Sequence, residues 1–190
     1  MNRLFSDVTR DELRTVFQPS KIVMGIVAVV PGIEYNLLPL CFHMWTSYSP
    51  LMYCVAIHCR NYSAELFRHA SDFALAIPGE TMADQVMYCG THSGRDTNKA
   101  EKCGVRWLSS QTIDTPGIAT ALANLELTVK KRVETGDHLL VVGEVLSIRL
   151  AQPHAERPLL AIGPKTEGLQ VLAKSGIHTI GVCPSRDSVL

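Results

Sequence analysis

A long alternating segment followed by a tight turn constrains the fold of this chain more than any other feature. Residues 122–133 alternate between apolar and polar side chains, and this period of two is typical of a β-strand with one face in solvent. The turn Thr135-Gly136-Asp137-His138 then reverses the chain into residues 139–151. Both faces of that second segment are largely apolar, which predicts a strand buried on two sides. We therefore expect a long antiparallel hairpin.

Four shorter apolar segments predict further strands. They are residues 22–30, 33–42, 51–59 and 72–77, and the first two are separated by the turn residues Pro31-Gly32. About six strands joined by hairpins and short helices indicate a mainly β (α+β) fold, a closed antiparallel barrel, because closure leaves no exposed strand edge. The length of 190 residues is typical of one domain, so we expect a single domain over residues 1–190.

Short helices are expected where a capping residue precedes an apolar stripe. Thr9 and Glu12 form a capping box for residues 10–17, Ser63 is the expected N-cap of residues 64–70, and Thr81 that of a helix ending at Tyr88. In the tail, residues 159–162, 166–174 and 178–182 mix a short strand with a helix that ends at Gly176.

Composition excludes several classes of partner. The 18 basic and 18 acidic side chains cancel, so there is no general field to attract nucleic acid or an anionic membrane. The longest apolar run, residues 22–30, is far shorter than the ~20 residues of a membrane-spanning helix. The six cysteines form no C-x-x-C pair, and the N-terminus has no signal-peptide pattern, so we expect a cytoplasmic protein.

The segment from Cys89 to Lys99 has the composition of an anion site. Gly90 and Gly94 permit positive φ, so backbone N–H groups can turn toward an anion. Hydroxyl donors and cations lie beside them: Thr91, Ser93, Arg95 and Lys99. Asp96 or Thr97 is the expected cap of a short helix that ends at Gly104. A solvated loop with a helix cap is the alternative interpretation.

A second segment repeats this chemistry. Arg60-Asn61-Tyr62-Ser63 again joins a cation and a hydroxyl to the start of a predicted helix. By contrast, Cys89 and His92 have the spacing of a metal-binding pair, but no second pair accompanies them, so no metal is expected. Residues 43–50 combine two aromatic and three hydroxyl side chains and predict a loop that either lines a ligand pocket or closes the end of the barrel.

In this order and spacing the segments resemble the flavin reductase-like, FMN-binding split barrels, which include NAD(P)H:flavin oxidoreductases and flavoredoxins. The matching residues, within residues 21–145, are Asn36 and Pro39, Trp45-Thr46-Ser47-Tyr48-Ser49-Pro50, Arg60-x-Tyr62-Ser63, Ser93-Gly94-Arg95-Asp96-x-x-Lys99, Gly136-Asp137-His138 and Val142-Gly143-Glu144-Val145. Two departures are a Ser-Pro-Leu end to the loop, where the family often has a double proline, and Cys41, where Ser or Thr is common.

The resemblance implies a six-stranded Greek-key split barrel that binds FMN in a homodimer, with the site completed by the partner subunit. It places the FMN phosphate at Arg60, Ser63, Ser93, Gly94 and Lys99, with Asn61, Tyr62 and Arg95 as further cofactor-binding residues. It places the isoalloxazine ring along the backbone of Trp45, Thr46, Ser47, Tyr48 and Ser49. It also places His138 near the flavin and the approach of the nicotinamide, as the candidate catalytic residue.

Two flavin functions and two others stay open. One is an NAD(P)H-dependent flavin reductase and the other a flavoredoxin-like electron carrier; the absence of a G-x-G-x-x-G motif after a strand does not separate them, because family reductases stack the nicotinamide directly on the flavin. A cysteine hydrolase would use Cys41, Cys59 or Cys89 with His138 as base. A non-catalytic barrel would leave the segment from Ser93 to Lys99 unexplained.

Overall fold

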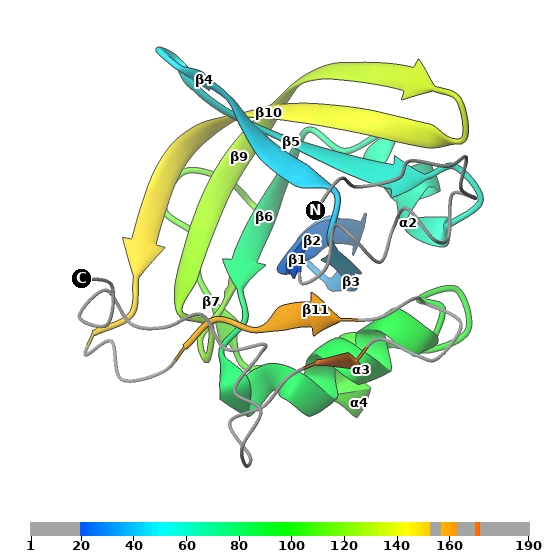
Figure 1. The fold of residues 1–190 in the computed structure, drawn as a ribbon, viewed down its shortest axis with the longest axis vertical. Coiled ribbons are helices and arrows are strands. Elements are labelled where there is room, and N and C mark those ends of the chain that lie inside the picture. The colour runs from blue at the N-terminus through cyan, green and yellow to red at the C-terminus, as the bar shows by residue number, and fades with distance from the viewer. Residues whose placement is uncertain (1–19, 153–156, 163–169, 172–190) are drawn as a thin grey trace, which may run out of the picture.

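The main sheet has seven antiparallel strands in the order β3-β2-β6-β9-β10-β5-β4 (Figure 1). It is seen in a computed structural model that describes residues 20–152, 157–162 and 170–171. Its strands are β2 (Val23–Val30), β3 (Glu34–Leu40), β4 (His43–Tyr48), β5 (Leu51–His58), β6 (Asp72–Ile77), β9 (Ala123–Thr135) and β10 (His138–Leu150). Two small sheets hold β1 (Ser20–Lys21), β11 (Leu160–Ile162) and β12 (Gln170–Val171), and β7 (Trp107–Leu108) and β8 (Gly117–Ile118). The predicted mainly β, antiparallel fold is confirmed.

Six of the seven strands lie where the sequence predicts them, with ends displaced by two residues at most. Both predicted hairpins are present, because β2 pairs with β3 and β9 pairs with β10. Their turns contain Gly32 and Gly136, with φ of 74° and 55°. Only glycine adopts such angles readily, which is why these positions reverse the chain.

The seventh strand, β4, replaces the loop predicted over residues 43–50. β4 pairs with β5 alone and forms one edge of the sheet, so its polar side chains keep their contact with solvent. Trp45 and Tyr48 are 44% and 86% exposed. The predicted count of six strands is therefore wrong. Within the described residues no ladder joins the two edge strands, β3 and β4, and closure into a split barrel stays a prediction.

The burial of the long hairpin also differs from its prediction. The first five residues of β9, 123–127, are buried on both faces, because the segment that contains β7 and β8 covers the face expected in solvent. In β10, burial alternates, and Leu146, Ile148 and Leu150 are exposed. Beyond Glu144, β10 pairs only with β9, so its far half lacks the two-sided burial that its apolar pattern predicts.

Two apolar clusters lie on opposite faces of the sheet. One is enclosed by the curled sheet and α2 (Tyr62–Phe67), and it includes Val27, Phe67 and Phe73. The other lies between the sheet and the helices α3 (Ala83–Thr91) and α4 (Lys99–Lys102), which run together along one side of the molecule (Figure 1). Alternate residues of β2 contribute to each cluster, which accounts for its unbroken apolar sequence.

The helices begin away from their predicted caps. α2 begins at Tyr62 after Asn61, so Ser63 lies in its first turn. A 3-10 turn, η1 (Glu80–Met82), contains Thr81 and precedes α3. The N-cap of α4 is Asn98, whose side-chain oxygen accepts a hydrogen bond from the Glu101 N–H at 3.1 Å. Ser63, Thr81, Asp96 and Thr97 are therefore not the caps, whereas Gly104 ends α4 as predicted, with φ of 58°.

Little of the two chain ends falls within the described residues. Residues 10–17 and 178–182, predicted as a helix and part of the tail, lie outside them. Residues 170–171, inside the helix predicted over 166–174, form β12 and pair with β11. No described helix is long and apolar enough to cross a membrane.

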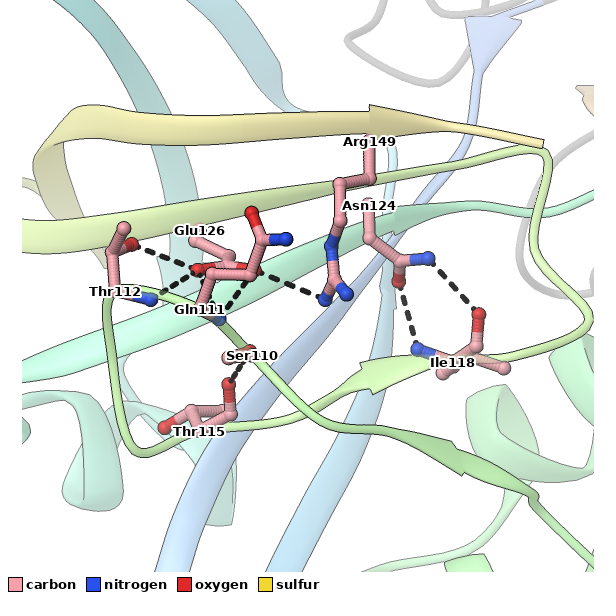
Figure 2. A network of polar contacts seen from close by, with 8 residues as sticks. All are labelled: Ser110, Gln111, Thr112, Thr115, Ile118, Asn124, Glu126 and Arg149. Carbon is pink, nitrogen blue, oxygen red and sulfur yellow. Dashed lines mark hydrogen bonds and ion pairs between the residues drawn. The ribbon is translucent and has the colours of Figure 1, made fainter.

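Glu126 is a fully buried carboxylate that fixes the covering segment to β9 (Figure 2). It accepts hydrogen bonds from the Gln111 N–H at 2.9 Å and from the Thr112 N–H and hydroxyl at 2.8 Å each, and the Arg149 guanidinium lies 3.0 Å away. Burial alone would raise the pKa of Glu126, but the bonds from Thr112 and Gln111 and the charge of Arg149 lower it overall. The group therefore stays ionised at neutral pH.

Glu126→Gln should lower the free energy of unfolding at pH 7 by about 3 kcal/mol, because the amide turns a donor toward groups that already donate. A lowered pKa means that this contribution is complete above the ordinary carboxyl value of 4.5 and is lost as the pH falls through the folded-state value. Urea unfolding at pH 7 and at pH values below 4.5 measures both effects, and the difference in stability between the two proteins should shrink as the pH falls.

Glu144→Gln is the matched control. Glu144 pairs with Lys130 across the partly exposed surface at 2.8 Å, and such pairs contribute about 1 kcal/mol or less. Equal stability of wild type and Glu126→Gln at pH 7 would contradict the assigned role of Glu126.

Candidate functional site

The turn between β5 and α2 presents Arg60 and Asn61 on the surface. The Cys59 N–H donates to the Asp137 carbonyl at 2.8 Å, and the Arg60 N–H donates to His58 Nδ1 at 3.1 Å. Arg60 and Asn61 are both exposed, and the Arg60 guanidinium has no hydrogen-bond partner among the described residues. The backbone is thus held while the cation stays available to an anion.

Ser63 is buried one turn further on and is bonded to another element. It is 5% exposed, and its Oγ accepts a hydrogen bond from Asn36 Nδ2 at 2.8 Å. Asn36 lies in β3 and is itself 3% exposed. Its own Oδ1 has no hydrogen-bond partner within the described residues. A buried amide of one edge strand therefore contacts the first turn of α2.

The loop between α3 and α4 reaches the same amide. A Cβ added at Gly94 would lie 2.0 Å from Asn36 Oδ1, so only glycine lets the loop come this close. The Ser93 Oγ accepts a hydrogen bond from the Arg95 N–H at 3.1 Å, which shapes a turn. Neither Gly90, which lies in α3, nor Gly94 has a positive φ. The predicted nest built on positive φ at these two residues is therefore wrong, and close approach is the reason for Gly94.

Arg95 and Tyr62 connect the loop to α2. The Arg95 guanidinium is 2.5 Å from a Glu65 carboxylate oxygen and 4.7 Å from the centre of the Tyr62 ring. Both groups of the ion pair are largely exposed, so the contact contributes little stability. It does orient Arg95 along α2, beside the residues that meet at Asn36.

Lys99 is buried and bonded to backbone within the fold. It is 5% exposed, and its Nζ donates to the Leu37 and Cys89 carbonyls at 2.9 Å each. Burial lowers the pKa of Lys99 from its ordinary value. The ammonium thereby ties α4 to β3 and to α3, and its two described bonds are structural.

His138 lies at the same end of the sheet as Arg60. Its Nδ1 is 2.6 Å from Asp137 Oδ1, and the His58 Nε2 is 3.6 Å from the other oxygen of that carboxylate. The hydrogen bond from His138 lowers the pKa of Asp137. His58 was missed by sequence reasoning, although the pairing of β5 with β10 places it directly opposite His138.

The predicted ring-binding residues lie along β4. Trp45 packs edge-on against Tyr53, with ring centres 4.6 Å apart. The Tyr53 hydroxyl donates to His43 Nδ1 at 2.5 Å, because His43 Nε2 must donate to the Lys21 carbonyl at 3.2 Å. Burial lowers the pKa of His43, so this pair is neutral. His43 and Tyr53 carry no sequence motif and were not predicted.

Further along β4, the pairing with β5 shifts register between Trp45 and Ser47, at Thr46. Ser47 Oγ accepts a hydrogen bond from the Ser49 N–H at 3.3 Å. Tyr48 is opposite Leu51, whereas His138 is opposite His58. Seven residues of extended β5 separate these positions, which is about 23 Å. Within one chain, the candidate phosphate-binding residues that follow β5, Arg60 to Ser63, and the tip of β4 therefore lie at opposite ends of β5.

The thiols give little support to a cysteine hydrolase. Cys89 is buried beside Lys99, and burial raises its pKa to about 12, so the thiol stays protonated at neutral pH. No described cysteine forms a disulfide. Within the same residues, no three His, Cys, Asp or Glu side chains gather as metal ligands would.

The residues near Asn36 fit a phosphate monoester. At Asn36, Ser63 supplies a buried hydroxyl and Gly94 a close approach of backbone, while the exposed cation of Arg60 lies three residues before Ser63 in the chain. These are the donors that phosphate sites in proteins use. The donor set of the described residues thus fits the phosphate of a nucleotide-type cofactor. Lys99 stabilises this part of the fold through its bonds to the Leu37 and Cys89 carbonyls.

Comparison with known sequences gives the family. A family model described as "Flavin reductase like domain" matches residues 20–170. A protein of Archaeoglobus fulgidus is 36% identical over 121 residues, which is 63% of this chain and 68% of that protein. A protein of Pyrococcus abyssi is 31% identical over 116 residues, which is 66% of its own length.

Solved structures agree in fold. The FMN-binding protein of Thermus thermophilus, with bound p-hydroxybenzaldehyde, has a TM-score of 0.75 at 21% identity, over 94% of this chain and 99% of that one. A flavoredoxin of Methanosarcina acetivorans scores 0.76 at 18% identity, over 94% and 96%. An NADH:FAD oxidoreductase of Streptomyces globisporus scores 0.70 at 21%, over 84% and 93%. With most of its length matched by the family model, this chain belongs to the flavin reductase-like domain family.

Proposed function

We propose that this protein binds FMN and acts as a flavin oxidoreductase, with the phosphate held between α2 and the loop from Ser93 to Arg95. The observation that carries the proposal is the meeting of Ser63 and Gly94 at the buried amide of Asn36. Arg60, whose side chain is exposed, precedes Ser63 by three residues. Two segments about thirty residues apart, each with the composition of an anion site, come together there.

The strength of these donors suits non-covalent binding of FMN. Each charge-assisted hydrogen bond to a phosphate contributes about 1.5–3 kcal/mol, so one guanidinium with hydroxyl and backbone donors is sufficient. A bound flavin would supply the redox chemistry itself. The chain has to hold the phosphate, present the ring and leave one ring face open to an electron donor.

Arg60→Ala tests the phosphate assignment. The variant should bind FMN about ten- to a hundredfold more weakly, because one charge-assisted bond is lost. Riboflavin, which lacks the phosphate, should bind wild type and variant equally. Quenching of flavin fluorescence by the apoprotein measures both dissociation constants.

The control for this test is Arg68→Ala. Arg68 follows the same helix, but it pairs with Glu134 at the other end, so its removal should leave the affinity for FMN within about twofold of wild type. Equal binding of riboflavin and FMN to the wild type would contradict the phosphate assignment.

Between the two flavin functions we favour the NAD(P)H-dependent reductase over the flavoredoxin-like carrier. His138, His58 and Arg60 form a polar and partly cationic rim at one end of the sheet. Such a rim suits the anionic phosphates of a nicotinamide cofactor. Asp137 holds His138 through Nδ1, which leaves Nε2 as the ring nitrogen that can contact flavin or nicotinamide. We propose His138 as the catalytic residue on this ground.

Anaerobic mixing with excess NADH and, separately, NADPH separates the two functions. The reductase should lose the absorbance of its flavin within seconds with one of them, and His138→Ala should slow this step about tenfold or more. His69→Ala, an exposed histidine of the same molecule, should not. If neither nicotinamide reduces the flavin but a reduced ferredoxin does, the protein is a carrier.

We also propose a homodimer that shares the flavin site. Within one chain, the tip of β4 and the candidate phosphate-binding residues after β5 lie at opposite ends of that strand. A second chain can therefore supply its β4 to the flavin whose phosphate the first chain holds. Apolar side chains are exposed on β4 and on the far half of β10: Met44, Trp45, Tyr48, Leu146, Ile148 and Leu150. Patches of this kind commonly mark protein interfaces.

Sedimentation equilibrium of the flavin-loaded protein should give twice the mass of the 20.9 kDa chain. Leu146→Asp and Ile148→Asp should each shift the equilibrium toward monomer, because a charge would be buried in an apolar interface. A monomer that keeps its flavin at micromolar concentration would contradict the shared site.

A further inference from the structure

Asn36 is a buried amide that satisfies only one of its two polar ends within the described residues. Its Nδ2 donates to Ser63 Oγ at 2.8 Å, but its Oδ1 has no partner. The side chain is 3% exposed, and an unsatisfied buried acceptor costs free energy. An apolar residue of similar size would avoid that cost. The presence of an amide at this position is therefore explained by what its donor group does.

The donor end determines what the hydroxyl of Ser63 can do. A serine hydroxyl has one proton to donate and two lone pairs. The N–H of Asn36 occupies one lone pair of Ser63 Oγ, so the hydroxyl proton points away from Asn36 Nδ2. Ser63 lies in the first turn of α2, three residues after Arg60. The amide therefore leaves that proton for an acceptor on the other side.

The acceptor end of the same amide contacts the loop from Ser93 to Arg95. A Cβ at Gly94 would lie 2.0 Å from Asn36 Oδ1 and 2.8 Å from Asn36 Cγ. The loop from Ser93 to Arg95 thus packs directly on the amide, while Lys99 fixes the neighbouring residue of β3 through the Leu37 carbonyl. Asn36 is the contact that α2 and this loop have in common.

We propose that Asn36 is a positioning residue that sets the preference of the site for a phosphate monoester over the dephosphorylated flavin. It acts through Ser63, by turning the hydroxyl proton toward the phosphate. Through its contact with Gly94 it also fixes how closely the loop approaches β3. The proposal rests on the proposed FMN function. A purely structural role would lower the stability of the protein and leave the ratio of FMN to riboflavin affinity unchanged.

A double-mutant cycle on this ratio is the test. Dissociation constants for FMN and riboflavin are measured by fluorescence for wild type, Asn36→Leu, Ser63→Ala and the double variant. Each single variant should reduce the preference for FMN about tenfold, and the double variant should lose no more than Ser63→Ala alone, since Asn36 acts through that hydroxyl. Asn36→Asp should lose more, because it accepts the proton of Ser63 and adds a negative charge.

Two controls keep the outcomes separate. Asn124→Leu removes another buried amide, one that is fully bonded to the Ile118 backbone; it should lower the melting temperature and keep the preference. Gly94→Ala should weaken FMN binding, because its Cβ would lie 2.0 Å from Asn36 Oδ1. If Asn36→Leu does not fold, Asn36→Ser, too short to reach Ser63, takes its place.

An unchanged preference in a folded Asn36 variant overturns the positioning role while the FMN function stands. Additive losses in the double variant overturn it as well, because the two residues would then act independently. A wild type that binds FMN and riboflavin equally overturns the phosphate assignment itself, and the inference falls with it.

Discussion

The buried ammonium group of Lys99 is the interaction on which the candidate site depends. Burying a charge is costly unless it is bonded, and Lys99 meets this condition with the Leu37 and Cys89 carbonyls. Those carbonyls belong to β3 and α3, so one side chain of α4 fixes three elements. Because both ends of the loop between α3 and α4 are held in this way, the loop crosses β3 beside Asn36. Gly94 permits this close contact because it has no side chain. The site at the surface is a consequence of a bond in the interior.

The strands could be predicted from the sequence because their patterns are local. A period of two, an unbroken apolar run and a Gly-containing turn each follow from backbone geometry. β4 could not, since its composition looks like a loop and its strand pairing is set by β5. Burial of Asn124 and Glu126 was equally hidden, because it is caused by the segment near Ile118, which lies over β9 only in the folded chain.

Residue types were better predicted than their roles. Gly94 was predicted for a positive φ, but the structure needs it for the close approach to Asn36. Ser63 resembles a helix cap in sequence, yet it is bonded to a strand 27 residues away. Lys99 lies in a segment predicted to bind the cofactor, and its ammonium group is buried and donates to the Leu37 and Cys89 carbonyls. In each case the partner comes from a distant segment, which no local spacing reveals.

The distribution of polar groups also explains what this chain can contribute to a reaction. Its buried, oriented donors gather near Asn36, where they suit a phosphate, while β4 offers aromatic rings and an exposed edge. The titratable pairs of the described candidate site are His138 and His58, which share the Asp137 carboxylate, and His43 with Tyr53. Such an arrangement suits a chain that holds a cofactor and leaves the redox chemistry to it. In the proposed dimer, turnover would depend on how the flavin ring is presented between the two subunits and on His138.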